Sequence, residues 1–144
     1  MQRIAMLCVH SSPLATLGGK ETGGMNVYVR ELSRKIADKG VQVDIFTRSQ
    51  NQHSPKVLLW HDGVRIIYLK AGLEKPYNKD HVWFHLPEFY GALQQFCIRE
   101  KINYDLIHSH YWLSGWVGLK LAKAHGIPLL HMFHTLACMK NSAT

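Results

Sequence analysis

Four glycines stand within the seven residues 18–24 and lead directly into a segment with helical periodicity. The N-terminus of a helix presents backbone N–H groups without intrahelical partners, and glycines there allow a ligand to approach the backbone closely. Such a segment can hold an anion or a polar sugar, and the Asn26 amide can both donate to and accept from a hydroxylated ligand. The same glycines also suit a flexible loop that only starts a helix, and the segment alone leaves both interpretations open.

Two familiar glycine motifs do not fit this segment. The dinucleotide-binding fingerprint needs a tight Gly-x-Gly-x-x-Gly turn and an acidic residue at the end of the second strand, whereas that strand ends in Thr47-Arg48. The phosphate loop of nucleoside triphosphatases needs Lys-Ser or Lys-Thr after its last glycine, but Met25-Asn26 follows here. The sequence therefore argues against a nicotinamide-dependent oxidoreductase and against a P-loop enzyme.

Histidines form the second group of residues that could do chemistry. His108 and His110 are two residues apart and so share one face of a strand, and His131 and His134 lie at the end of a later candidate strand. Carboxylates near them are scarce and no His-Glu-x-x-His pattern exists, so we expect buried, hydrogen-bonded histidines and no metal. A Gly-x-Ser-x-Gly nucleophile motif is also absent from the sequence.

The elements that must position these residues alternate between strands and helices. Strands are predicted at 3–10, 41–48, 104–110 and 127–134, with two short strands around Asp62-Gly63 within 57–70, and helices at 24–39, around 89–97 and at 112–125. Short connections between such elements imply right-handed crossovers and a mostly parallel sheet covered on both faces. We therefore predict one α/β domain over residues 1–144, with a Rossmann-like, doubly wound sheet.

Ligands of such sheets bind outside the carboxyl ends of the strands. Those ends carry residues 10–12, the glycine segment, residues 108–111 and residues 133–136. We therefore expect one cradle for a charged, hydroxyl-rich small molecule, with aromatic rings such as Tyr111 available to stack on a sugar.

Composition limits the classes of protein to be considered. Hydrophobic residues make up 47% of the chain and charged residues 19%, which is typical of a globular domain. The net charge of +7 comes from basic residues spread along the chain, so small anionic ligands fit better than nucleic acid. The sequence shows no signal peptide, and its apolar runs are shorter than the ~20 residues that a membrane span needs. We therefore expect a cytoplasmic protein. Cys8, Cys97 and Cys138 are interpreted as small buried hydrophobic residues.

Three segments, in this order and spacing, resemble the N-terminal domain of retaining glycosyltransferases of family 4: VHSSPLATLGGKETGGMNVYVREL, HSHYWLSGW and FHTLACMKN. The resemblance covers essentially the whole chain. It implies the N-terminal half of a GT-B fold, in which two Rossmann-like domains face each other across a cleft. The N-terminal domain of that fold holds the acceptor and the C-terminal domain holds most of the nucleotide-sugar donor, and the resemblance implies that this donor domain is absent from the 144 residues.

The resemblance also implies roles for particular residues. It implies that Gly23 and Gly24 bind the donor and that His134 is catalytic, with its backbone carbonyl near the reacting centre. The acceptor-binding residues that it implies are Asn26, Lys79, Tyr111 and Thr135. An arginine that the family places soon after Lys140-Asn141 to bind phosphate is missing here. The reaction implied is front-face substitution without a protein nucleophile, a metal or a cofactor.

The implied function is transfer of a sugar from a nucleotide-sugar donor to a phosphorylated acceptor that is inositol phosphate-like or fructose 6-phosphate-like. The isolated chain is expected to be inactive because its partner, the donor-binding domain, is missing. A stand-alone module that binds sugar phosphates without catalysis is the alternative. Self-association into a homo-oligomer is left open.

Overall fold

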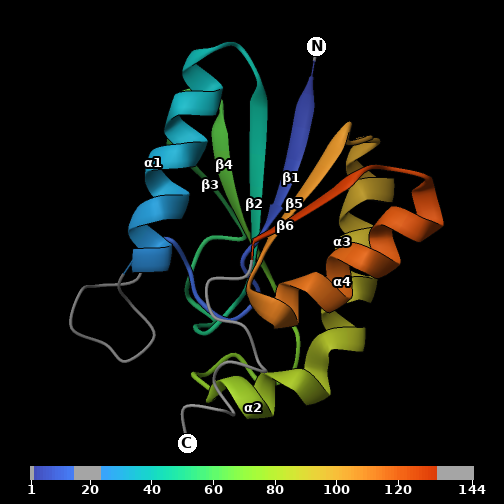
Figure 1. Cartoon of the computed structure of the whole chain (residues 1–144). Coiled ribbons are helices and arrows are strands. Elements are labelled where there is room, and N and C mark those ends of the chain that lie inside the picture. Colours follow the sequence, from blue (N-terminus) through green and yellow to red (C-terminus); the bar gives the residue numbers. More distant parts are fainter. Residues whose placement is uncertain (1, 15–23, 133–144) are drawn as a thin grey trace, which may run out of the picture.

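The computed structural model describes residues 2–14 and 24–132, and the structural statements that follow concern these residues. They form a six-stranded sheet in the order β3-β4-β2-β1-β5-β6 (Figure 1). The strands are β1 (Arg3–Leu7), β2 (Gln42–Arg48), β3 (Val57–His61), β4 (Val64–Leu69), β5 (Leu106–His110) and β6 (Leu129–Met132). Neighbouring strands run parallel except for β3 and β4, which form an antiparallel hairpin.

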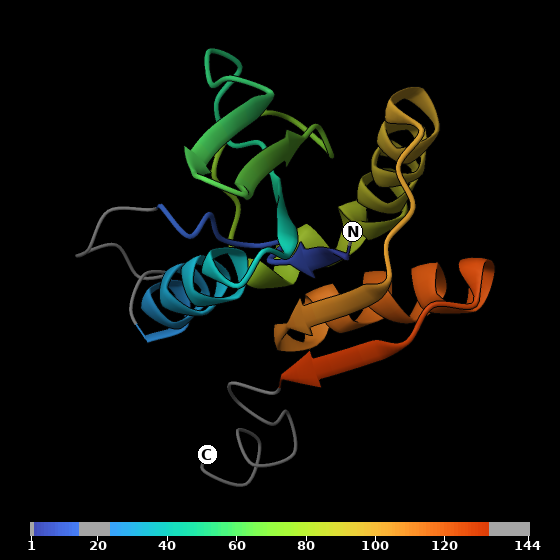
Figure 2. The same ribbon diagram turned by 90° about the horizontal axis from the view of Figure 1, so that it is seen from above.

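Helices cover both faces of the sheet, as Figure 2 shows from above. The long helices are α1 (Gly24–Asp38), α3 (Leu86–Glu100) and α4 (Tyr111–His125), and a single turn, α2 (Lys79–Val82), precedes a short 3-10 helix (Trp83–His85). α1 lies on one face, and α3 and α4 lie on the other (Figure 2). No helix within the described residues is long and apolar enough to cross a membrane.

The alternation of side chains along the strands divides the core into two parts. Met6 of β1 packs with Val29 of α1, whereas the next residue, Leu7, packs with Leu93 of α3 and Leu113 of α4. All of these side chains are fully buried, as expected when both faces of a mostly parallel sheet are covered. The core therefore holds the carboxyl ends of the strands and the N-termini of α1 and α4 in fixed positions.

The predicted α/β class and the predicted order of elements are confirmed, with small shifts at the ends. The Asp62-Gly63 dipeptide closes the β3–β4 hairpin, and Gly63 has the positive φ of 86° that favours glycine in such turns. Gly40 and Gly126 end α1 and α4 in the left-handed conformation, as the sequence indicates. The single turn α2 and the 3-10 helix that follows it are elements that the sequence pattern did not reveal.

Candidate functional site

The carboxyl ends of β1, β2 and β5 meet the N-termini of α1 and α4 at one end of the sheet, and α2 lies at the same end (Figure 1). In an α/β sheet of this topology, ligands are expected at this end. Of the seven residues assigned by resemblance, Gly24, Asn26, Lys79 and Tyr111 belong to the described part of the chain. Gly23, His134 and Thr135 lie outside the described residues, so their placement stays a prediction.

The start of α1 offers an open backbone and one buried amide. Gly24, the first residue of the helix, is exposed, and a Cβ added to it would meet no atom within 4 Å. Asn26 is 1% exposed, and its Nδ2 donates a hydrogen bond to Ser11 Oγ at 3.1 Å. Its Oδ1 is buried and accepts no hydrogen bond from the described residues. A buried amide oxygen without a partner can accept a hydrogen bond from a ligand hydroxyl.

Tyr111 joins β5 to α4 in a strained conformation. Its φ of 73° lies in the left-handed region, which is costly for an aromatic residue and is often found at functional sites. The Ser114 hydroxyl accepts a hydrogen bond at 2.9 Å from the backbone N–H of Val9, which ties the first turn of α4 to the end of β1. The Tyr111 ring lies 4.7 Å from the His10 ring, measured between centroids. These contacts hold the tyrosine at the end of β1.

Lys79 approaches the same place from α2. The Asn78 side chain accepts a hydrogen bond from the His81 N–H at 2.8 Å and so caps the turn that Lys79 begins. The Lys79 Nζ lies 5.0 Å from the centroid of the Tyr111 ring, a cation–π contact. Lys79 therefore contacts Tyr111, and Tyr111 is linked to Asn26 through the adjacent residues His10 and Ser11.

His10 and Ser11 provide this link, because they are adjacent in the chain and contact Tyr111 and Asn26 respectively. The sequence placed them among the unusual residues at a strand end, but nothing in it indicated their partners. Ser114 was missed, since a serine in the first turn of a helix carries no specific signal. The buried role of Arg48 was missed as well, although a charged residue at the end of an apolar strand is a signal for such a role.

The histidines lie on opposite faces of the sheet. The rings of His108 and His110 are 4.3 Å apart on the face covered by α1, where His110 also contacts Tyr28. His131 points to the α4 face, where its Nδ1 and Ser109 Oγ are 2.6 Å apart. The predictions that His108 and His110 share a face and are buried are confirmed. The described residues contain no group of three His, Cys, Asp or Glu side chains placed to hold a metal ion.

A cavity of about 650 Å³ lies along β4 and α3. None of Asn26, Lys79 and Tyr111 lines it. The thiols of Cys8 and Cys97 are not activated. Burial raises the pKa of the Cys8 thiol, and raises that of Cys97 to about 11, so both stay protonated at neutral pH. Cys138 lies outside the described residues.

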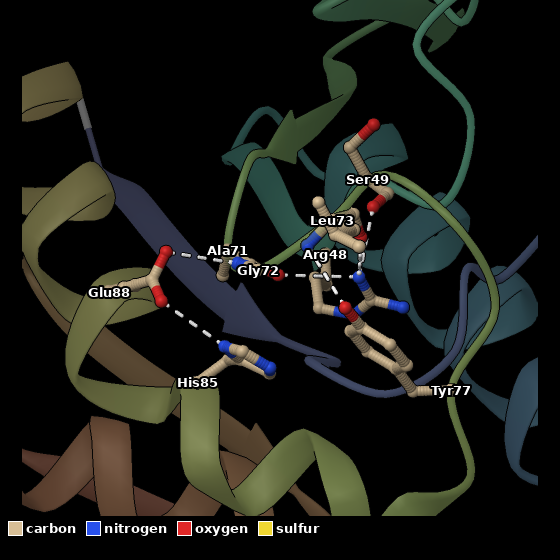
Figure 3. A network of polar contacts seen from close by, with 8 residues as sticks. All are labelled: Arg48, Ser49, Ala71, Gly72, Leu73, Tyr77, His85 and Glu88. Atoms are coloured by element: carbon tan, nitrogen blue, oxygen red, sulfur yellow. Dashed lines mark hydrogen bonds and ion pairs between the residues drawn. The ribbon is translucent and has the colours of Figure 1, made fainter.

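A loop between β4 and α2 carries a glycine that the structure requires. Gly72 has a φ of 73°, and a Cβ there would lie 2.9 Å from the ring atoms of His85. The ring is held in place, because His85 Nδ1 and Glu88 Oε1 are 3.1 Å apart and Glu88 Oε2 accepts from the Gly72 N–H at 3.0 Å (Figure 3). The Gly72 N–H and, secondarily, His85 hold the pKa of Glu88 below its ordinary value.

Gly72→Ala is therefore expected to destabilise the protein more than Gly126→Ala. Both glycines have a left-handed φ, which costs an alanine about 1–2 kcal/mol. Only at Gly72 must a ring also move, because a Cβ at Gly126 would meet no atom within 4 Å. We expect the displaced ring to add about 1–3 kcal/mol to the loss at Gly72. Urea unfolding of the two variants measures the difference, and equal losses would contradict the packing argument.

Comparison with known proteins identifies the family. The Glycosyl transferase 4-like domain family matches residues 23–143. D-inositol 3-phosphate glycosyltransferase of Corynebacterium glutamicum is 42% identical over 140 residues, covering 97% of this chain and 34% of that protein. The same-named protein of Kineococcus radiotolerans is 44% identical over 144 residues, covering 99% of this chain and 33% of that protein. The chain thus spans about a third of the length of the curated relatives it matches.

Solved structures agree with this identification. Sucrose-phosphate synthase from Thermosynechococcus elongatus superposes with a TM-score of 0.92 at 36% identity, covering 99% of this chain and 35% of that one. The catalytic domain of starch synthase IV from Arabidopsis thaliana, at 14% identity and a TM-score of 0.64 over 93% of this chain, shares the fold alone. The predicted N-terminal half of a GT-B fold is confirmed. With a matching family over most of its length, the chain belongs to the Glycosyl transferase 4-like domain family.

Proposed function

We propose that this chain is the acceptor-binding domain of a retaining glycosyltransferase that transfers a sugar from a nucleotide-sugar to a phosphorylated polyol or sugar. The observation that carries the proposal is the series of contacts that links Lys79, Tyr111 and Asn26 at the carboxyl ends of the strands. A lysine ammonium attracts a phosphate dianion, and a buried amide suits a hydroxylated body beside it. Two related proteins are a D-inositol 3-phosphate glycosyltransferase and a sucrose-phosphate synthase, and both names contain a phosphorylated polyol or sugar, which supports this class of acceptor.

Each residue then has a role that its chemistry supports. Lys79 and the hydroxyls of Tyr111 and Thr135 bind the acceptor phosphate, and the Asn26 Oδ1 accepts from an acceptor hydroxyl. The donor diphosphate meets the backbone at Gly23 and Gly24, where the helix N-terminus favours an anion. His134 contacts the donor sugar.

These groups would catalyse by preorganisation. As the bond to the donor diphosphate breaks, negative charge grows on the leaving oxygen, and fixed N–H donors at the start of α1 are oriented to stabilise it. The acceptor oxygen is held on the same face of the sugar by the contacts to its phosphate and hydroxyls, so the configuration is retained. This scheme uses neither a protein nucleophile nor a cofactor. It requires a second domain that holds most of the donor, so the 144 residues alone should not catalyse transfer.

The proposal is tested in two steps. Calorimetric titration of the chain with fructose 6-phosphate and with an inositol monophosphate, each compared with its unphosphorylated parent, should show binding at least about tenfold tighter for one phosphorylated compound. Equal binding of both members of each pair would overturn the acceptor assignment. Measurable transfer from UDP-, GDP- or ADP-sugars by the purified 144 residues would contradict the requirement for a second domain.

A further inference from the structure

Arg48, the last residue of β2, is a buried cation held by backbone oxygens. Its side chain is only 2% exposed. The guanidinium donates to the carbonyl oxygens of Ser49 at 3.3 Å, Ala71 at 3.3 Å, Leu73 at 2.9 Å and Lys75 at 2.5 Å. No carboxylate pairs with it among the described residues, and burial lowers its pKa. A buried charge is costly, so this arrangement needs an explanation.

The loop that Arg48 holds is closed by Tyr77. The guanidinium carbon lies 4.5 Å from the centroid of the Tyr77 ring, and the Tyr77 hydroxyl accepts from the Leu73 N–H at 3.1 Å (Figure 3). The ring also stacks on His85, with 5.2 Å between centroids and an interplanar angle of 11°. Residues 71–77 therefore wrap around one arginine side chain and are fixed to the turn before α3.

This loop leads directly to the candidate phosphate ligand. Asn78 follows Tyr77 and caps α2, and Lys79 is the first residue of that turn. The contacts of Arg48 thus end at the Tyr77 ring, two residues before Lys79, whose ammonium reaches Tyr111. A shift of the loop would move Lys79 away from Tyr111 and from the rest of the candidate site.

We propose that Arg48 is a positioning residue, which fixes residues 71–77 and so places the Lys79 ammonium in the acceptor-phosphate site. The proposal rests on the function proposed above. Only arginine suits this role, because its planar fork of five N–H donors can reach several carbonyl oxygens at once. A lysine at this position would keep the charge but would not span the loop. Arg48 acts through the loop in this proposal, because both of its terminal nitrogens donate to backbone carbonyl oxygens.

A double-mutant cycle in the intact protein that contains this chain tests the role. Arg48→Lys should weaken binding of the phosphorylated compound about tenfold, and that of its unphosphorylated parent less than about twofold. In the Lys79→Ala background, the same change should alter the dissociation constant of the phosphorylated compound by less than about twofold. Arg34→Lys, the same chemical change at an exposed position of α1, is the matched control and should alter neither constant. Full affinity of Arg48→Lys, or an undiminished loss in the Lys79→Ala background, would overturn the proposal.

Hydrogen exchange tests the loop without any ligand. Arg48→Lys should speed amide exchange in residues 71–82 and leave α4 unchanged. If Arg48→Lys does not fold, Tyr77→Phe replaces it in both experiments, because this variant loses only the hydroxyl that accepts from Leu73. Unchanged exchange in residues 71–82 would overturn the inference. A wild-type protein that binds phosphorylated and parent compounds equally would refute the proposed function instead, and the exchange experiment would still decide whether Arg48 holds the loop.

Discussion

Lys79→Ala is expected to weaken the binding of a phosphorylated acceptor by about 10- to 100-fold, which corresponds to the loss of one hydrogen bond between charged groups. The affinity for the unphosphorylated parent should change by less than about threefold, because the proposed contact of Asn26 with an acceptor hydroxyl is untouched. The reason for the large effect is geometric. The ammonium lies over the Tyr111 ring at a half-buried position, where water screens its charge less than at an open surface. Isothermal titration of the intact protein with both compounds measures the two affinities.

Lys39→Ala provides the control for the loss of charge alone. Lys39 is exposed just after the end of α1, and that helix starts at the candidate site, so the residue lies at the opposite end of the sheet. This change should alter either affinity by less than about twofold, since solvent and salt screen a distant surface charge. Thr135→Val should lower the affinity for the phosphorylated compound more than that for its parent, in the same direction as Lys79→Ala. Equal losses for the phosphorylated and parent compounds would remove Lys79 from the phosphate site.

Asp44→Ala is expected to lower the free energy of unfolding by about 3–5 kcal/mol, the usual cost of removing one partner from a buried ion pair. Asp44 lies on β2 and is 1% exposed. Arg65 donates to both of its carboxylate oxygens, at 2.8 and 2.9 Å, and the Tyr104 hydroxyl donates to it at 2.6 Å. Burial and the negative charge of Asp44 raise the pKa of Tyr104, so its hydroxyl remains a donor throughout the neutral range. The variant leaves the Arg65 guanidinium and the Tyr104 hydroxyl without their acceptor, and urea unfolding measures the loss.

Glu31→Ala serves as the matched carboxylate change at the surface. Glu31 pairs with Arg34 at 3.3 Å on the exposed side of α1, with both side chains about half exposed. Exposed pairs of this kind contribute about 0–1 kcal/mol, so this variant should unfold close to the wild type. A loss for Asp44→Ala as small as that for Glu31→Ala would show that the buried network does not stabilise the fold.

Sequence patterns alone were sufficient to predict the architecture and the end of the sheet that carries the candidate site. Apolar runs and helical periodicity identified the strands and the long helices, because these patterns depend on neighbours a few residues away. The alternation of strands and helices then required a mostly parallel sheet, and the topology of such sheets placed candidates such as Asn26 and Tyr111 at one end of it. The motifs HSHYWLSGW and GGKETGGMNV carried the family resemblance without any structure.

The contacts between residues at that end became visible only in the folded chain. Ser11 meets Asn26 across 15 positions of the chain, and Arg48 reaches carbonyl oxygens as far as 27 positions away. No local pattern encodes such pairings, since they arise when separate elements pack on a common sheet. The strand pleat likewise separates His131 from His108 and His110 by placing their side chains on opposite faces of the sheet. Long-range packing, rather than local propensity, therefore determines which side chains share the candidate site.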